Sequence, residues 1–352
     1  MKNKKALHLS ITIAIIFIVL YIILAAKPLA KEYQIIPEWK ISTSNPLIKE
    51  SNKDQMYFHL GQTIGYFTED GEITSFESFP SKVSISDKYY ATYDSVSKNI
   101  PFYFPNKTLA GEIEAEGYPY FKDDLIFLFL PGGASFSKCS ETGKIEWTYE
   151  GIIPVTAFST NKNYTAAGFA DGSILIFSNA DGTIISTFSP SGSDYPVILG
   201  LDISEDGQYL ASISGRNKQR FVLTHREEKQ QKPIFHTFLE SDSPNQTLVH
   251  FCKNENRVLY NFHNKLGIYD IDTQKNTILS LDSKLISIDE NEDFVFLLGK
   301  DKKKYTVSIV EKTNTLLGHF TFNADTAFIH ANKKNLYVGK DSSISKLLIS
   351  ND

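Results

Sequence analysis

The side chains best suited to metal binding or proton transfer are eight histidines, and they are scattered along the 352 residues. None of them has the H-x-H or H-E-x-x-H spacing that brings two imidazoles to one metal ion. The sequence also lacks a calcium-binding loop, a phosphate-binding loop, a dinucleotide-binding glycine pattern and a G-x-S-x-G nucleophile turn. We therefore assign no catalytic, metal-binding or cofactor-binding residues, and we expect a protein that is not an enzyme.

Two cysteines and one pair of carboxylates are the remaining candidates for chemistry. Cys139 and Cys252 lie far apart and fall in different repeats of the pattern described below, which favours two small buried thiols over a disulfide. Asp123 and Asp124 are interpreted as turn residues, because adjacent side chains on a strand point to opposite faces and would not act together.

Composition indicates which elements would position such groups. Hydrophobic residues make up 41% of the chain and charged residues 22%, as in ordinary globular proteins. The 18 tyrosines and 25 phenylalanines, together with short runs of Ile and Val, favour strands over helices. The formal net charge of −5 argues against nucleic acid as a partner, because phosphate binding needs a basic surface.

The N-terminal segment, residues 6–26, reads ALHLSITIAIIFIVLYIILAA and contains no charged side chain. A helix of about 20 apolar residues is long enough to cross a bilayer. Lysines precede the segment within residues 1–5, so the positive-inside rule keeps this end in the cytoplasm and exports the rest. We expect residues 6–26 to be a single transmembrane signal-anchor helix, followed by a linker over residues 27–32.

A cleaved signal peptide is the alternative for this segment. Residues 24–26, Leu-Ala-Ala, would suit a signal peptidase loosely, but the apolar run is longer than the usual hydrophobic region of roughly 7–15 residues. No lipid-acceptor cysteine follows the segment, which argues against a lipoprotein anchor. We therefore expect a single-pass protein of the cytoplasmic (inner) membrane, with residues 33–352 in the periplasm or outside the cell.

The exported part, residues 33–352, consists of short alternating segments separated by turns rich in Asp, Asn, Ser and Gly. The clearest unit, Val155–Phe188, predicts four strands with an Asp-Gly turn, where Gly accepts a positive φ without steric cost. The next unit predicts three strands over Ile198–His225. We expect the charged residues His225–Lys232 to form a longer loop after them.

Repeated units of this kind are spaced by roughly 32–49 residues, the period of propeller blades. Their second strands are predicted to begin near Tyr57, Tyr89, Leu125, Tyr164, Tyr209, Val258, Phe294 and Leu336. Four-stranded sheets at this period close radially and leave only short, protected edges. We therefore predict an all-β fold, a β-propeller of about eight four-stranded blades. Seven blades is the alternative, if the units near Tyr57 and Leu336 share one blade.

The two chain ends are predicted to close the ring. The last unit offers three strands, Thr326–His330, Asn335–Gly339 and Ser343–Ile349, and lacks a fourth. The segment Tyr33–Ser42, just after the N-terminal segment, is a strand candidate without a unit of its own. We infer that this segment completes the last blade.

Two short motifs carry a resemblance to known repeat families. Ser140–Glu150, SETGKIEWTYE, resembles the T-G-K-x-x-W docking motif of quinoprotein-type (PQQ-like) propellers, with Thr142–Lys144 and Trp147 at the matching positions. In that motif the Gly permits a turn between outer strands, and the Trp caps the neighbouring blade. Ser204–Ala211, SEDGQYLA, resembles a strand turn of WD40-like repeats, although no unit has the Gly-His and Trp-Asp pair of true WD40 blades.

The resemblance implies a scaffold, since exported propellers of this kind include the outer-membrane-assembly lipoproteins, which hold partners rather than transform substrates. We expect a non-enzymatic, membrane-anchored scaffold for protein–protein interaction in the cell envelope, with envelope or membrane proteins docking on one mouth of the ring. The alternative is an enzyme or sensor that binds a small ligand in the central channel, as quinoprotein dehydrogenases do. On the expected inner strands only Asp202 and His250 would suit such a ligand, and we assign a site to neither.

Overall fold

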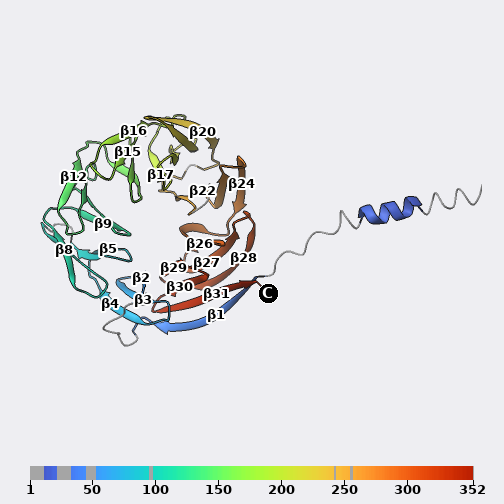
Figure 1. Cartoon of the computed structure of the whole chain (residues 1–352), viewed down its shortest axis with the longest axis horizontal. Helices are drawn as coiled ribbons and strands as arrows, with labels where there is room; N and C mark the ends of the chain where they lie inside the picture. Colours follow the sequence, from blue (N-terminus) through green and yellow to red (C-terminus); the bar gives the residue numbers. More distant parts are fainter. Residues whose placement is uncertain are drawn as a thin grey trace, which may run out of the picture. The chain divides into compact units, whose positions relative to one another are not determined.

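The structure, a computed structural model, describes residues 12–21, 33–44, 53–94, 98–241, 243–253 and 257–351. Apart from one helix over residues 12–21, the described elements are β-strands (Figure 1). Contacts divide the chain into a large unit, residues 37–348, and a small unit that combines residues 1–36 with residues 349–352. The prediction that residues 33–352 form an all-β fold is therefore confirmed for the described residues.

The predicted membrane anchor, residues 6–26, is described only in its middle part. The helix over residues 12–21 exposes its apolar side chains, among them Phe17 and Tyr21. Residues 6–11 and 22–26 lie outside the described residues. Over the described parts of the chain, no helix has the length and hydropathy needed to cross a bilayer, and the anchor stays a prediction.

The large unit is built from antiparallel sheets that follow one another along the chain. The first three groups of strands are β2 (Gln55–Leu60), β3 (Thr63–Thr68) and β4 (Ile73–Ser78); β5 (Lys82–Ile85), β6 (Tyr90–Tyr93), β7 (Ile100–Tyr103) and β8 (Leu109–Ile113); and β9 (Tyr118–Lys122), β10 (Leu125–Phe129), β11 (Phe136–Cys139) and β12 (Ile145–Tyr149). The next three groups are β13 (Val155–Thr160), β14 (Tyr164–Phe169), β15 (Ile174–Ser178) and β16 (Ile184–Phe188); β17 (Ile198–Ile203), β18 (Tyr209–Ser214), β19 (Arg220–Glu227) and β20 (Gln230–Phe238); and β21 (Val249–Phe251), β22 (Arg257–Phe262), β23 (Lys265–Asp270) and β24 (Lys275–Ser280). The last two groups are β25 (Lys284–Glu290), β26 (Phe294–Asp301), β27 (Lys304–Glu311) and β28 (Leu316–Asn323); and β29 (Ala327–Asn332), β30 (Asn335–Lys340), β31 (Ser343–Asn351) and β1 (Tyr33–Ser42).

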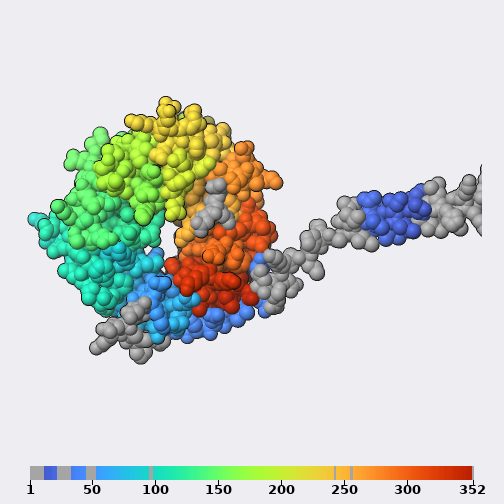
Figure 2. Space-filling model, viewed as in Figure 1, coloured from blue at the N-terminus to red at the C-terminus, as the bar shows by residue number. Residues whose placement is uncertain are grey.

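These sheets stand around a common centre, as the colours in Figure 1 show by running from blue to red around the ring. In the space-filling view the ring is hollowed at its centre (Figure 2). The runs β13–β16 and β17–β20 are joined into one sheet by a single parallel pair, Thr187 with Gln230. Other neighbouring sheets meet through side chains and through single backbone hydrogen bonds, such as the one from the N–H of Val155 to the carbonyl of Gly133 at 2.9 Å.

The ring is closed by β1, which is the outermost strand of the sheet β1-β31-β30-β29. The N–H of Thr43 donates to the carbonyl of Ser342 at 2.8 Å, and Lys346 forms an ion pair with Glu38 at 2.7 Å. The prediction that Tyr33–Ser42 completes the last unit is therefore confirmed, with the predicted bounds.

Aromatic side chains fill the space between neighbouring sheets, which explains their abundance. Phe221 stacks on Tyr260 of the next sheet with ring centroids 3.9 Å apart, and Phe235 stacks on Tyr269 at 4.1 Å. Phe221 and Tyr260 are fully buried. Large flat rings suit this position because each buries much apolar area between two twisted sheets.

Both tryptophans of the chain make the same contact between neighbouring sheets. The ring of Trp147, on β12, lies 2.7 Å from where a Cβ on Gly182 would stand, and the ring of Trp39, on β1, lies 3.2 Å from the corresponding position on Gly71. Both glycines have positive φ, at 72° and 84°. The indole N–H groups donate to the carbonyls of Asn179 at 3.1 Å and Glu69 at 3.2 Å. Each indole therefore covers a turn of the next sheet, as the Ser140–Glu150 motif predicts for Trp147.

The long loop predicted over His225–Lys232 is wrong, because this segment is a hairpin. β19 continues to Glu227 and β20 begins at Gln230, which leaves a two-residue turn. Glu228 has the positive φ, 56°, that such a turn requires. Glu227 and Lys232 form an ion pair across the hairpin, so the charge run marks solvent-exposed strands rather than a loop.

Candidate site at the channel mouth

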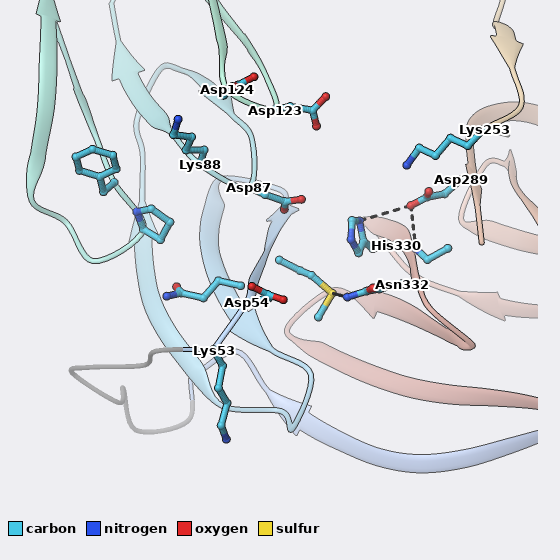
Figure 3. A pocket seen from close by; sticks show the side chains of 15 residues that line it. Lys53, Asp54, Asp87, Lys88, Asp123, Asp124, Lys253, Asp289, His330 and Asn332 are labelled. Atoms are coloured by element: carbon cyan, nitrogen blue, oxygen red, sulfur yellow. Dashed lines mark hydrogen bonds and ion pairs between the residues drawn. The ribbon is translucent and has the colours of Figure 1, made fainter. Parts of the chain in front are cut away.

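A cavity of about 720 Å³ opens where several turns converge at the channel (Figure 3). It is lined by the turns β5–β6, β7–β8 and β9–β10, by Lys253 after β21, and by parts of the strands β2, β25 and β29. Its carboxylates are Asp54, Asp87, Asp123, Asp124 and Asp289, and its basic side chains are Lys53, Lys88, Lys253 and His330.

Figure 3 shows how these groups face one another across the cavity. Asp87 and Asp123 come from one side, and Lys253, Asp289 and His330 come from the other. His330 lies 3.5 Å from Asp289. A site of this kind can bind a charged group by converging side chains.

The carboxylates of the cavity disturb each other's ionisation. Burial raises the pKa of Asp87, and the charges of Asp123 and Asp289 add to this effect, although the Tyr57 N–H and His330 oppose it. Burial and the same carboxylates raise the pKa of Tyr57 to about 12. The cavity therefore has a negative field that favours a positively charged occupant.

Asp123 and Asp124 form the turn between β9 and β10, so their prediction as turn residues is confirmed. Asp123 has the positive φ, 51°, of a tight turn. On a strand the two carboxylates would point to opposite faces. In the turn both line the cavity.

Asp202, on the innermost strand β17, connects neighbouring sheets. Its Oδ1 accepts a hydrogen bond from Ser159 on β13, and its Oδ2 accepts one from the N–H of Phe251 on β21 at 2.8 Å. Asp289 of β25 repeats this arrangement by accepting from the N–H of Ala331 on β29 at 2.9 Å. These bonds account for both oxygens of Asp202, which therefore stabilises the ring.

His250, on β21, pairs with Glu290 of the next sheet. Its Nε2 lies 2.9 Å from Oε1 of Glu290, whose side chain is only 1% exposed. Burial alone would lower the pKa of His250, but the bond to Glu290 and the charges of Asp202 and Asp289 raise it. Burial would raise the pKa of Glu290, but His250 and the N–H of Lys253 lower it. Each partner therefore favours the charged form of the other.

The described residues hold no group of three or more His, Cys, Asp or Glu side chains placed to bind a metal ion. Among the inner-strand residues, the sequence analysis singled out Asp202 and His250, and in the structure the side chains of both bond to groups on neighbouring sheets. It missed Asp87, Asp289 and His330, which face the cavity. The sequence held one signal for Asp87. Asp87 and Asp123 each stand two residues before the predicted start of a second strand, at Tyr89 and Leu125.

Both cysteines are buried and no disulfide joins them, as expected from their positions in different repeats. Burial raises the pKa of the Cys139 thiol to about 12. We expect Cys139 in the folded protein to react with iodoacetamide at pH 8 at least about a hundredfold more slowly than in denaturant, because the thiolate is the reactive form. Quenched labelling followed by mass spectrometry measures this, and equal rates in both states would show that Cys139 is accessible.

Radial sheets around a channel, closed by a strand from the other chain end, define a β-propeller. A family model described as "beta-propeller protein" matches residues 1–351, and the chain belongs to this family. An uncharacterized protein of Treponema pallidum (strain Nichols) is 25% identical over 363 residues, which cover 99% of this chain and 96% of that protein.

Solved structures show the same fold at low sequence identity. BamB from Moraxella catarrhalis superposes with a TM-score of 0.62 at 11% identity, covering 90% of this chain and all of that one (100%). The computationally designed Ika8 protein superposes with a TM-score of 0.63 at 13% identity, covering 85% of this chain and 94% of that one. At these identities the likeness concerns the fold alone.

Proposed function

We propose that this protein is a non-enzymatic scaffold of the cell envelope, tethered to the cytoplasmic membrane by residues 6–26 and holding partner proteins on its exported propeller. The observation that carries the proposal is a group of exposed apolar side chains on neighbouring sheets. Ile152 is 95% exposed, Tyr195 is 61% exposed and Phe238 is 57% exposed. Large apolar side chains exposed in one region mark sites of protein interaction.

The topology places these three side chains on one face of the ring. Ile152 lies between β12 and β13, and Tyr195 between β16 and β17, so both are on connections from the outermost strand of one run to the innermost strand of the next. Phe238 is the last residue of the outermost strand β20, at the same end. In an antiparallel meander all such connections lie on the same face. We call Ile152, Tyr195 and Phe238 the docking face.

Cationic side chains flank the docking face. The N–H of exposed Arg216 donates to the carbonyl of Tyr195 at 3.1 Å, and the guanidinium of Arg220 lies over the ring of Phe238 at 5.7 Å. Lys218, on the same turn as Arg216, is exposed. Aromatic and Arg side chains together are typical of interface centres. The partner segment that fits this surface presents apolar side chains flanked by acidic ones.

We also propose that the propeller has eight blades. Seven four-strand runs and the three-stranded sheet β2-β3-β4 each form one blade in this count, among the described strands. Tyr57 and Leu336 lie in different sheets, on β2 and β30, which favours eight blades over seven. The alternative function, binding of a small ligand in the channel, has the channel-mouth cavity in its favour.

The docking face can be tested by affinity purification of the tethered full-length protein after crosslinking in cells. We expect the double variant Ile152→Ser, Tyr195→Ser to recover about tenfold less of the crosslinked partner, because the loss of two interface anchors costs about 1.4 kcal/mol of binding free energy. The matched control is Leu109→Ser, which removes a side chain that is 61% exposed at the opposite end of a sheet. Undiminished recovery in the double variant, or capture of a specific small molecule without any protein, would contradict the scaffold.

A further inference from the structure

The loops that carry the docking face touch one another in turn along the ring. The carbonyl of Pro154, in the β12–β13 connection, accepts a hydrogen bond at 3.0 Å from the N–H of Ala170 in the β14–β15 turn. In this turn, a Cβ on Gly172 would stand 2.5 Å from the Cβ of Pro196, which belongs to the β16–β17 connection. The surface is therefore continuous from the β12–β13 connection to the β16–β17 connection.

Carboxylates stand at the Ile152 end of the docking face. Glu150 lies two residues before Ile152 and is exposed, as is Asp171 in the β14–β15 turn. Burial raises the pKa of Tyr149, and the charge of Asp171 adds to this effect, so Asp171 lies near the end of β12. A third exposed carboxylate, Asp194, lies in the β16–β17 connection. We call Glu150 and Asp171 the acidic end.

Cationic groups stand at the Phe238 end of the docking face. The guanidinium of Arg220 lies 5.7 Å from the ring centroid of Phe238, and its Nη1 donates to the carbonyl of Ser191 at 2.9 Å. Ser191 belongs to the β16–β17 connection, so the surface is continuous to this end as well. Arg216 and Lys218, in the β18–β19 turn, are exposed. We call Arg216, Lys218 and Arg220 the basic end.

The two ends are opposite in charge, and exposed apolar side chains lie between them. Glu240, two residues after Phe238, pairs with Lys265 at 2.7 Å, so this carboxylate does not neutralise the basic end. A patch of this kind is complementary to itself when a second copy is turned by 180°, because the acidic end of each copy then meets the basic end of the other.

The acidic end also has the chemistry that the basic end requires of a partner. A segment that fits beside Tyr195 and Phe238 presents apolar side chains flanked by acidic ones. Ile152, with Glu150 and Asp171 on either side of it in the chain, is such a segment. The docking face therefore contains both halves of a contact that it cannot make within one molecule.

Ile152 is held in place for a contact of this kind. Its side chain is 95% exposed, but the backbone on both sides of it is fixed. The N–H of Gly151 donates to Oγ of Ser135 at 3.0 Å, and the N–H of Val155 donates to the carbonyl of Gly133 at 2.9 Å. An anchor on a fixed backbone loses little conformational freedom on binding, so more of its apolar contact appears as affinity.

We propose that a second copy of this chain binds the docking face about a two-fold axis near Tyr195, so that Ile152 of each copy packs against Phe238 of the other and the acidic end of each copy faces the basic end of the other. The inference rests on the proposed function, because it uses the docking face, and it names one occupant of that face. A partner protein that docks there must displace the second copy. Tethering by residues 6–26 confines both copies to one membrane and raises their effective concentration, which favours the dimer.

The first test places an aromatic photocrosslinking amino acid at Ile152 of the full-length tethered protein, in cells that also produce a second copy with a different affinity tag. We expect a covalent complex that carries both tags, with the crosslink in β20 or the β18–β19 turn of the second copy. The control is the same amino acid at Leu109, which is 61% exposed at the opposite end of a sheet and should capture no second copy. Failure to capture the second copy from Ile152 would overturn the proposal.

The dimer and the scaffold can fail separately in this experiment. Capture of another protein from Ile152, without the second copy, overturns the dimer and leaves the scaffold standing. Capture of the second copy from Ile152, with no other protein captured from any position on the docking face, supports the dimer and contradicts the scaffold.

The second test exchanges the charges of the two ends. Glu150→Lys brings basic groups together at both contacts of the two-fold axis, and the double variant Arg216→Glu, Lys218→Glu brings carboxylates together there. These side chains are exposed, so the exchanges should leave the fold unchanged. Each variant alone should give about tenfold less crosslinked dimer than the parent, because like charges oppose association.

Producing the two charge variants in the same cells restores opposite charges at both contacts. The yield of crosslinked dimer should then return to within about twofold of the parent, because only the mixed pair avoids repulsion. An undiminished yield in either variant alone, or no recovery in the mixed pair, would contradict the two-fold arrangement.

Discussion

Replacing Trp39 with alanine is expected to lower the free energy of unfolding by about 3 kcal/mol. The indole closes the ring, because it lies on β1 from the start of the propeller, covers Gly71 on the next sheet and contacts Tyr337 at 5.9 Å between ring centroids. Its removal opens a gap at the junction of the two chain ends and leaves the Glu69 carbonyl without the indole N–H. Urea unfolding of the full chain, followed by tyrosine fluorescence, measures the effect.

The neighbouring variant Lys40→Ala is the control, because Lys40 lies on the same strand and is exposed. Its unfolding free energy should stay within about 0.5 kcal/mol of the parent. Trp147→Ala removes the equivalent contact between β12 and the β15–β16 turn and should lower the free energy of unfolding by a similar amount. If Trp39→Ala proves as stable as Lys40→Ala, β1 does not close the ring through this contact.

Removing the imidazole of the His250–Glu290 pair is expected to have a similarly large effect. His250→Leu leaves the carboxylate of Glu290, with a side chain 1% exposed, without its cation, and we expect a loss of about 3 kcal/mol in the free energy of unfolding. The double variant His250→Leu, Glu290→Met should recover most of this loss, because removing both charges leaves no buried charge unpaired. If the double variant is no more stable than His250→Leu, the unpaired carboxylate of Glu290 is not the cause of the loss in stability.

The same pair gives stability a defined pH dependence. The pKa of His250 is raised in the folded protein, so its contribution is complete below the ordinary value of 6.5 and is lost as pH rises through the folded value. The pKa of Glu290 is lowered, so its contribution is complete above the ordinary value of 4.5 and is lost as pH falls through the folded value. The difference in unfolding free energy between the parent and the double variant should therefore peak between these two values.

Local pattern was sufficient to predict much of the fold. Alternation and Asp-Gly turns gave β14 at its observed bounds, Tyr164–Phe169, because each strand buries one face against a neighbouring sheet. Tyr33–Ser42 was placed in the last sheet because that unit lacked a strand. His225–Lys232 was misread because strands at the rim of the ring are polar, so their composition resembles that of a loop.

The candidate site was beyond such reasoning. Asp87, Asp123 and Asp289 are far apart in sequence and meet only because turns and a strand end from different sheets converge at one mouth of a closed ring. Asp202 was considered as a residue that would suit a channel ligand, without a site being assigned to it. Its bonds to Ser159 and Phe251 arise between sheets, where no pattern along the chain reports them.

The central claim is that this propeller holds a protein partner on its docking face. A photocrosslinking amino acid at Tyr195, in the intact chain within its own cells, tests it directly, with the same amino acid at Leu109 as the reference position. We predict one protein partner captured from Tyr195 and absent from Leu109. The same proteins captured in equal yield from both positions would contradict the claim.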